Sequence, residues 1–232
     1  MHTGSWGGAH PSGGGEHPAP AAAAGVSHPH RHGPGTPWEA TVSWAQIFEH
    51  QRQRQPLIEE WLDWLELAPG DHLVDLGAGP GLTSILAARR VQPHGRVIAV
   101  DHWPEALAFL RQQVAREGVA NVEAVLVDIG RDDELEQQIP PGFARKVVLA
   151  HVLHHLSDPQ DVLQRLHRWL APGARMVVAE FDPEGAGRVG PPRQERIAWP
   201  TLRDWLAGQG FRLIRHEGYA EQEQYAVLVE RP

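Results

Sequence analysis

Residues 73–81, Leu-Val-Asp-Leu-Gly-Ala-Gly-Pro-Gly, constrain the fold more than any other part of this chain. An apolar run carries Asp75, three glycines follow within five residues, and a helical pattern begins at Leu82. Glycine lets the backbone approach a ligand where a Cβ would clash, and the start of a helix presents free N–H groups. A tight turn without a ligand is the alternative, but this density of glycine favours a ligand-binding turn.

The spacing of the glycines separates two classes of nucleotide ligand. A dinucleotide-binding turn reads G-x-G-x-x-G or A, whereas this one reads G-x-G-x-G with Leu82 in the sixth position. Asp75 stands two residues before the first glycine, where its charge would repel a pyrophosphate. The pattern therefore favours a cationic, phosphate-free adenosyl ligand over NAD.

Length and composition exclude several kinds of protein. The 232 residues suit one α/β domain with extensions. The net charge of −8 makes nucleic acid an unexpected partner, and the absence of cysteine excludes disulfides, thiolate metal sites and cysteine nucleophiles. No apolar run is long enough to span a membrane or to form the core of a signal peptide. We therefore expect a cytoplasmic protein that does not bind membranes.

Residues 1–37 are rich in Gly, Pro, Ala and His and contain almost nothing that could form a core. We expect a disordered tail. Its histidines suggest weak binding of a divalent metal, although their irregular spacing favours a solvated extension. They are His2, His10, His17, His28, His30 and His32.

Residues 38–69 form a second region, an aromatic helical cap. The pattern from Thr41 to Leu67 is helical with a break near Pro56. A helix this rich in aromatic residues needs a surface to cover, so we expect it to pack against the sheet domain.

Residues 70–232 alternate between apolar strand segments and helical segments. This alternation predicts a doubly wound α/β fold with a seven-stranded, mostly parallel sheet and an antiparallel C-terminal strand. The expected strands end at Asp75 or cover 96–100, 122–127, 146–150, 175–181, 211–216 and 224–230. The expected helices cover 80–90, 104–118, a short segment near 132–136, 159–170 and 199–207.

Residues 74–81 resemble motif I of the class I S-adenosylmethionine (SAM) dependent methyltransferases, and the order of elements in residues 70–232 is similar to that family. The resemblance implies a Rossmann-like methyltransferase fold, SAM as cofactor and an enzyme that transfers a methyl group. Residues 190–196, Gly-Pro-Pro-x-x-x-Arg, resemble the small-molecule branch that includes the ubiquinone/menaquinone and arsenite groups. Without cysteine, the thiol-assisted arsenite reaction is not expected here.

Polar residues stand at the ends of four successive strands: Asp75, Asp101, Asp128 and His151. Ligands of open α/β sheets bind beyond these ends. The resemblance implies that Asp101 holds the ribose hydroxyls and that Asp128 with Ile129 holds the adenine. It also places Asp75 and the turn residues Gly77, Ala78, Gly79 and Gly81 at the methionine end, and either His102 or Trp103 against the adenine.

The segment Val148–Pro159 contains His151, His154 and His155. It is similar to a metal-free strand-four motif of small-molecule methyltransferases in which one histidine packs and caps the next helix, so we expect no metal here. His151 is the candidate general base, because histidine can accept a proton near neutral pH. A role as a wall of the SAM pocket is equally compatible with the sequence.

A small-molecule acceptor is the expected partner. The resemblance suggests that Trp38, Trp44 or Phe48 from the helical cap lines the acceptor pocket, with His155 nearby. The candidates in the loop 182–196 are Arg188, Arg193 and Arg196, which could clamp an anionic or carbonyl-bearing acceptor. Alternatively, these arginines pair with Glu184 and Glu195 in a solvated loop.

The sequence is also compatible with two other classes of function. One is an NAD(P)-binding oxidoreductase, and the other is a non-catalytic protein that binds SAM or metal. The oligomeric state is also open, with a homodimer as one option.

Overall fold

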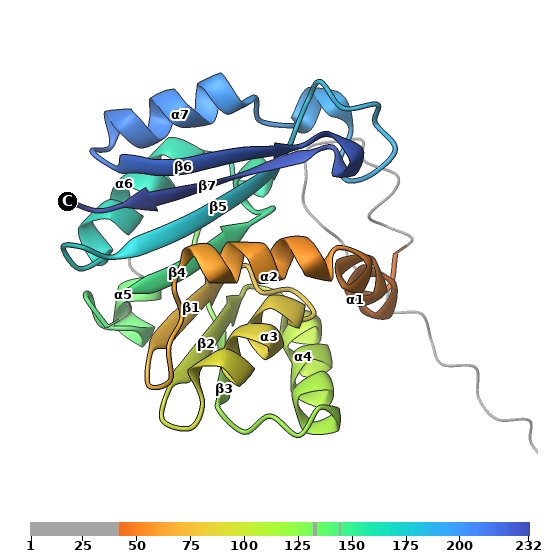
Figure 1. The fold of residues 1–232 in the computed structure, drawn as a ribbon, viewed down its shortest axis with the longest axis vertical. Coiled ribbons are helices and arrows are strands. Elements are labelled where there is room, and N and C mark those ends of the chain that lie inside the picture. The colour runs from red at the N-terminus through yellow and green to blue at the C-terminus, as the bar shows by residue number, and fades with distance from the viewer. Residues whose placement is uncertain (1–41, 132–133, 144) are drawn as a thin grey trace, which may run out of the picture.

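The computed structural model describes residues 42–131, 134–143 and 145–232 (Figure 1). The N-terminal tail with its histidines and Trp38 lies outside this part of the chain. The helices are α1 (Trp44–Gln53), α2 (Gln55–Trp64), α3 (Leu82–Val91), α4 (Pro104–Arg116), α5 (Glu134–Gln138), α6 (Pro159–Trp169) and α7 (Trp199–Gly208). The strands are β1 (His72–Leu76), β2 (Arg96–Asp101), β3 (Val122–Leu126), β4 (Lys146–Ala150), β5 (Arg175–Phe181), β6 (Arg212–Tyr219) and β7 (Gln224–Glu230). Single 3-10 turns cover 153–155, 193–195 and 220–222.

The seven strands form one sheet in the order β3-β2-β1-β4-β5-β7-β6. The first five strands run parallel, and β7 is antiparallel to both β5 and β6. The chain moves outward from β1 to β3 and then returns to place β4 on the other side of β1. This return is the topological switch point of a doubly wound sheet, so the predicted fold class is confirmed.

Helices cover both faces of the sheet (Figure 1). Side chains of α5, α6 and α7 pack on one face, and those of α1, α2 and α3 pack on the other. Neighbouring residues of β1 alternate between the two layers, since Leu73 belongs to the second and Val74 to the first. Strands buried on both faces need apolar residues at successive positions, which explains their nearly continuous apolar runs. Within the described residues, no helix is long and apolar enough to cross a membrane.

The predicted break in the helical cap is present between α1 and α2. Arg54 separates the two helices, and Pro56 occupies the first turn of α2, where its missing N–H costs nothing. Ser43 begins α1 with a reciprocal hydrogen-bond pair to Gln46. The break lets the two helices run in different directions, with α2 lying across the sheet and α1 beyond its end (Figure 1).

Several strand boundaries differ from the prediction, by one residue in β1 and β2 and by more in β6. β3 ends at Leu126 rather than Val127, which places Asp128 two residues beyond the strand. β6 extends to Tyr219 rather than His216, although most of its residues are exposed. As the edge strand, β6 is held by hydrogen bonds to β7 rather than by burial of an apolar face, and sequence periodicity does not detect this.

The loop 182–196 is fixed to the sheet by Glu223, which corrects the predicted role of Arg196. Glu223 is 1% exposed and accepts hydrogen bonds from Arg196 Nη1 (3.0 Å) and Arg188 Nε (3.1 Å). Arg196 also donates to the carbonyl oxygens of Pro191, Asp182 and Val189, and its side chain is fully buried. Its guanidinium donates its hydrogen bonds within the protein and, being buried, is not available to bind an acceptor.

The ion-pair partners expected for the loop arginines also differ. Arg188 and Arg196 pair with Glu223 rather than with Glu184 or Glu195, and Arg193 donates to the carbonyl oxygen of Pro183. Although burial raises the pKa of Glu223, hydrogen bonds from the Arg188 N–H, the Arg196 side chain and the Gly187 N–H lower it to about 2. Glu223 thus stays ionised and holds the loop at neutral pH.

Replacing Arg196 with methionine should destabilise the fold. Arg196→Met leaves the Glu223 carboxylate buried without its fully enclosed partner, and breaking a buried pair costs on the order of 3 kcal/mol. The free energy of unfolding in urea measures the loss. Arg193→Met, at an exposed position of the same loop, should stay within about 0.5 kcal/mol of the wild type. Equal unfolding midpoints for the two variants would contradict the anchoring role of Arg196.

Candidate functional site

The turn after β1 brings the backbone close to a cavity. Gly79 and Gly81 have φ angles of +53° and +93°, a region that side chains rarely adopt. A Cβ at Gly81 would lie 2.5 Å from Leu110 Cγ, so this glycine is needed where α3 and α4 pack together. A Cβ at Gly79 would meet only Gln51 Nε2, at 4.0 Å. The middle of the turn therefore faces outward from the sheet, toward α1.

Asp101 joins the end of β2 to this turn. Its Oδ2 accepts a hydrogen bond from the Gly79 N–H (2.8 Å), and its Oδ1 accepts one from the Trp103 N–H (2.9 Å). The residue is 7% exposed. Burial raises the pKa of Asp101, and the hydrogen bonds from Trp103 and Gly79 oppose that rise. An ionised carboxylate accepts about four hydrogen bonds, so both oxygens can still accept from a ligand.

Asp75 lies inside the cavity rather than at its rim. It is 3% exposed and accepts a hydrogen bond from Ser84 Oγ at 2.6 Å. Burial raises the pKa of Asp75 from 3.8 to about 7, the Ser84 hydroxyl opposes the rise, and the nearby Asp101 adds to it. Asp75 is therefore poised between its neutral and charged forms near pH 7, and a cationic ligand would favour the charged form.

Two of the residues expected around the adenine, Asp128 and His102, are more exposed to solvent than Asp75 and Asp101. Asp128 Oδ1 accepts from the Gly130 N–H (2.9 Å), and its Oδ2 lies 3.2 Å from Arg131 Nε. Ile129 is 7% exposed and packs in the core with residues of α5 and α6. The His102 side chain is 49% exposed, and its ring centroid lies 4.6 Å from the Trp103 ring.

His151 follows β4 with a φ angle of +59°, uncommon for a residue other than glycine. Its Nε2 lies 2.7 Å from Gln224 Oε1, and its ring centroid lies 4.4 Å from Phe181 and 6.0 Å from Trp61. Burial lowers the pKa of His151 well below 6.5, the Arg54 and His154 charges lower it further, and Gln224 opposes them. The imidazole is therefore neutral at neutral pH and only a weak base, which favours a wall of the cavity over a general base.

The three histidines of this segment have different surroundings. His154 Nδ1 lies 2.6 Å from Glu180 Oε2, and both side chains are almost fully buried. Glu180 Oε1 accepts from the Leu153 N–H, so this pair fixes the start of the 3-10 turn. His155 is exposed, with its ring centroid 3.9 Å from that of His154. Among the described residues, no group of three or more His, Asp or Glu is arranged to hold a metal ion.

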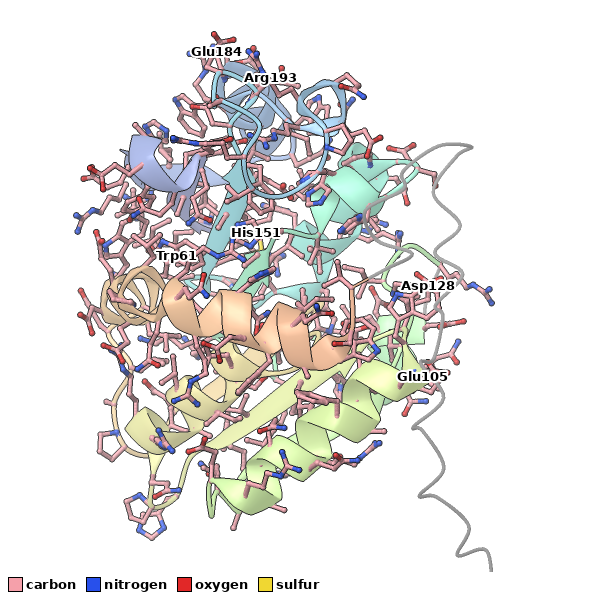
Figure 2. All side chains as sticks on the ribbon, turned by 90° about the vertical axis from the view of Figure 1, so that its right-hand side faces the viewer. Trp61, Glu105, Asp128, His151, Glu184 and Arg193 are labelled. Carbon is pink, nitrogen blue, oxygen red and sulfur yellow. The ribbon has the colours of Figure 1, made fainter. Side chains whose placement is uncertain are left out.

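The cavity lies between α1, α2 and the ends of β1 and β4. It contains about 400 Å³ of empty space, part of it open to solvent. It is lined by Gln51, Arg54, Ile58, Trp61, Asp75, Gly77, Ala78, Thr83, Ala150 and His151. Figure 2 shows Trp61 and His151 close together in the middle of the molecule, whereas Arg193 and Glu184 project from the far end of the loop.

The helical cap lines this cavity with Gln51, Arg54, Ile58 and Trp61. The predicted Trp44 and Phe48 are not among the lining residues. Phe48 is 7% exposed and packs edge-on against Phe109 on α4, with ring centroids 5.8 Å apart, so it belongs to the core. Trp44 is half-buried in the first turn of α1. Sequence reasoning missed Gln51 and Arg54. The signal for Arg54 was present, since its spacing to Ile58 and Trp61 (i, i+4, i+7) places a charge on an apolar helical face.

Fold and site define a Rossmann-like α/β protein with a cavity at its switch point, lined on the sheet side by Asp75 and the glycine turn. A family profile described as a methyltransferase domain matches residues 67–213, more than half of the chain. The chain belongs to this methyltransferase domain family, and its resemblance to the class I SAM-dependent methyltransferases is confirmed.

Three relatives indicate the range of the family. The chain is 34% identical to the arsenite methyltransferase of Halobacterium salinarum over 49% of this chain and 28% of that protein. It is 27% identical to the 2-phytyl-1,4-naphtoquinone methyltransferase of Thermosynechococcus vestitus over 71% and 66% of the two chains. It is 32% identical to the demethylmenaquinone methyltransferase of Thermus thermophilus over 54% of each. The chain thus spans from about a quarter to about two thirds of these relatives.

Solved structures agree on the fold. A SAM dependent methyltransferase from Aquifex aeolicus aligns with a TM-score of 0.66 at 23% identity, over 74% of this chain and 88% of that one. The cyclase SpnF aligns with a TM-score of 0.62 at 16% identity, over 76% and 81%. Because proteins named for different reactions share this fold, the fold by itself does not specify the reaction.

Replacing Asp75 with asparagine should remove a pH dependence of stability. Because the pKa of Asp75 is raised in the fold, its contribution to stability is largest below pH 4 and is lost as the pH rises to 7. Asp75→Asn carries no such loss, so between pH 4 and pH 8 it should gain stability relative to wild type by roughly a few kcal/mol. Urea unfolding across this range measures the difference. The exposed Asp63→Asn should give a constant difference from wild type, and parallel curves for Asp75→Asn would refute the raised pKa.

Proposed function

We propose that this chain is an S-adenosylmethionine-dependent methyltransferase with a small-molecule acceptor. The observation that carries the proposal is the link between the glycine turn and two buried acids. Asp101 binds the turn directly through the Gly79 N–H, and Asp75 lies on the strand that leads into it. A turn with exposed backbone and acids at adjacent strand ends suits a cationic nucleoside without phosphates.

The chemistry of the residues around the glycine turn supports this cofactor. Asp101 retains acceptor capacity for two ribose hydroxyls, because each of its oxygens accepts one backbone hydrogen bond. Asp128 and Ile129 follow β3, and His102 directly follows Asp101 at the end of β2; these three residues are the proposed adenine end. Asp75, Gly77, Ala78, Gly79 and Gly81 lie on the β1 side and are the proposed methionine end.

When bound, SAM supplies a methyl group on a positively charged sulfur, which departs as a neutral thioether. The protein's task is then mainly to hold the acceptor in line and to exclude water. Trp61 and Ile58, from α2, cover the cavity above the ends of β1 and β4. They would shield the reacting atoms from solvent.

We propose that neutral His151 forms a wall of the acceptor position. Its lowered pKa makes it able to take a proton only from a group that is itself acidic. The aromatic rings of Trp61 and Phe181 beside it suit a flat acceptor ring. The relatives named as 2-phytyl-1,4-naphtoquinone and demethylmenaquinone methyltransferases support an acceptor with a flat ring. An acceptor that enters the site already ionised needs no base at His151.

Replacing Asp101 with alanine should weaken SAM binding by about 2–3 kcal/mol, because charge-assisted hydrogen bonds to the ribose are lost. Isothermal titration calorimetry measures the dissociation constant. Asp204→Ala, on the exposed surface of α7, removes a carboxylate remote from the cavity and should bind SAM as the wild type does. Unchanged affinity in Asp101→Ala would defeat the ribose assignment.

The catalytic activity is tested by incubating the full chain with methyl-labelled SAM and fractionated metabolites, with naphthols and quinols as added acceptors. We expect label in a low-molecular-weight aromatic product. Tight SAM binding without transfer to any fraction would instead indicate a non-catalytic SAM-binding protein. Tighter binding of NADH than of SAM would indicate the oxidoreductase class.

A further inference from the structure

His151 and His154, which lie three residues apart after β4, have partners of different charge. His154 Nδ1 lies 2.6 Å from the Glu180 carboxylate, whereas His151 Nε2 lies 2.7 Å from the side-chain amide oxygen of Gln224. A carboxylate partner strengthens a histidine as a base, because it stabilises the imidazolium form. A neutral amide gives little such help, so its main effect on His151 is to fix the position and the hydrogens of the ring.

The Gln224 side chain is buried although its own hydrogen-bonding capacity is only partly used. The residue is 1% exposed at the start of β7, between its cross-strand neighbours Phe181 and Tyr219. Within the part of the chain that the structure describes, Gln224 Nε2 has no hydrogen-bond partner, and a buried amide donor without a partner costs free energy. An apolar residue of the same size would avoid this cost, so what the glutamine adds at this position is its contact with His151.

This contact decides which ring nitrogen of His151 carries the hydrogen. An amide oxygen only accepts hydrogen bonds, so the Nε2 atom that lies against Gln224 Oε1 is the protonated nitrogen of the neutral ring. The other nitrogen, Nδ1, then has a free lone pair. Among residues 42–131, 134–143 and 145–232, no group forms a hydrogen bond with His151 Nδ1.

Three further contacts hold the imidazole at the wall of the cavity. The His151 backbone N–H donates to the Ala179 carbonyl oxygen at 2.8 Å. The Phe181 ring lies 4.4 Å from the imidazole between centroids, at an interplanar angle of 32°, and the Trp61 ring lies 6.0 Å away. His151 and Trp61 both line the cavity, and Figure 2 shows them close together. A ring that is packed against two aromatic rings and hydrogen-bonded at Nε2 has only Nδ1 left for a ligand.

We propose that Gln224 is a positioning residue that keeps His151 in its Nε2–H form, so that Nδ1 accepts a hydrogen bond from an O–H or N–H group of the acceptor. This inference rests on the proposed function, and it narrows the acceptor to flat molecules that carry a hydroxyl or an amine. The group beside His151 enters the site with its hydrogen in place, whether or not another group of the same molecule is ionised. The hydrogen bond orients the acceptor and requires no transfer of the proton, in keeping with a histidine that is only a weak base.

Nuclear magnetic resonance tests the position of the hydrogen on the protein alone. In the full chain labelled with ¹⁵N-histidine, the His151→Gln variant identifies the His151 signals, because its spectrum lacks them. We expect the long-range ¹H–¹⁵N correlations of the wild type to show hydrogen on Nε2 alone. Gln224→Met removes the accepting oxygen at similar side-chain size, so both forms of the ring should appear. Gln224→Glu keeps an oxygen at this position and should keep the Nε2–H form.

Binding of two probe molecules tests what Nδ1 contacts. 1-Naphthol carries a hydroxyl hydrogen, and 1-methoxynaphthalene has the same rings without it. In the presence of S-adenosylhomocysteine at pH 7, calorimetry on the wild type should give an affinity for 1-naphthol that is about 5- to 10-fold the higher, as expected for one neutral hydrogen bond. This preference should shrink in Gln224→Met and persist in Gln224→Glu. Because the extra size of the methoxy group is the same in every variant, the change in preference isolates the hydrogen bond.

A matched control is Gln112→Met, which makes the same exchange at an exposed position of α4. It should give the wild-type spectrum of His151 and the wild-type preference for 1-naphthol. Folding of Gln224→Met is checked by its melting temperature, which should equal or exceed that of the wild type because a buried donor without a partner is removed.

Three results would overturn this inference and leave the proposed function intact. They are a wild-type spectrum with hydrogen on Nδ1, equal affinities of the wild type for the two naphthalenes, and a preference that Gln224→Met leaves unchanged. If the wild type instead binds neither SAM nor S-adenosylhomocysteine, the proposed function fails, and the inference about its acceptor fails with it even where the ring shows the Nε2–H form.

Discussion

The parallel pairing of β1 between β2 and β4 is the constraint on which the site depends. Leu76 pairs with Val100 on one side and with Leu149 on the other, so the three strands end together at one edge of the sheet. Asp75, Asp101 and His151 are far apart in the sequence and meet only because of this register. The apolar layers on both faces hold the register, since a shift by one residue would exchange the faces of every side chain.

Hydrogen bonds then convert this edge into a defined site. The Asp101 carboxylate fixes the glycine turn through the Gly79 N–H, and the buried pair of His154 with Glu180 fixes the chain after β4. Glu223 performs a similar role for the loop after β5 by accepting hydrogen bonds from two arginines. In all three places, a buried carboxylate holds an irregular segment at the same end of the sheet. Rigid segments of this kind lower the entropy cost of binding a ligand.

The helical cap completes the site from above. Ile58 and Trp61 provide apolar cover, and Arg54 introduces a positive charge where the sheet provides a negative one. Burial shifts both charges toward neutrality, because it raises the pKa of Asp75 and lowers that of Arg54. A ligand with complementary charges would reverse both shifts. Its binding would therefore be coupled to the ionisation of the cavity.

The sequence by itself determined the order and type of the elements, because alternation between apolar strands and amphipathic helices has few other solutions. It also determined the glycine turn and the acids at the strand ends, since both lie within local motifs. Only the tertiary structure decided the roles of side chains that act over long sequence distances. Glu223 accepts a hydrogen bond from Arg196, which lies 27 residues earlier in the sequence. Gln224 Oε1 forms a hydrogen bond with His151, which lies 73 residues earlier. The packing of α2 on the sheet places Arg54 in the lining of the cavity. Burial and partners set the charge and availability of these groups, and neither is encoded in local sequence.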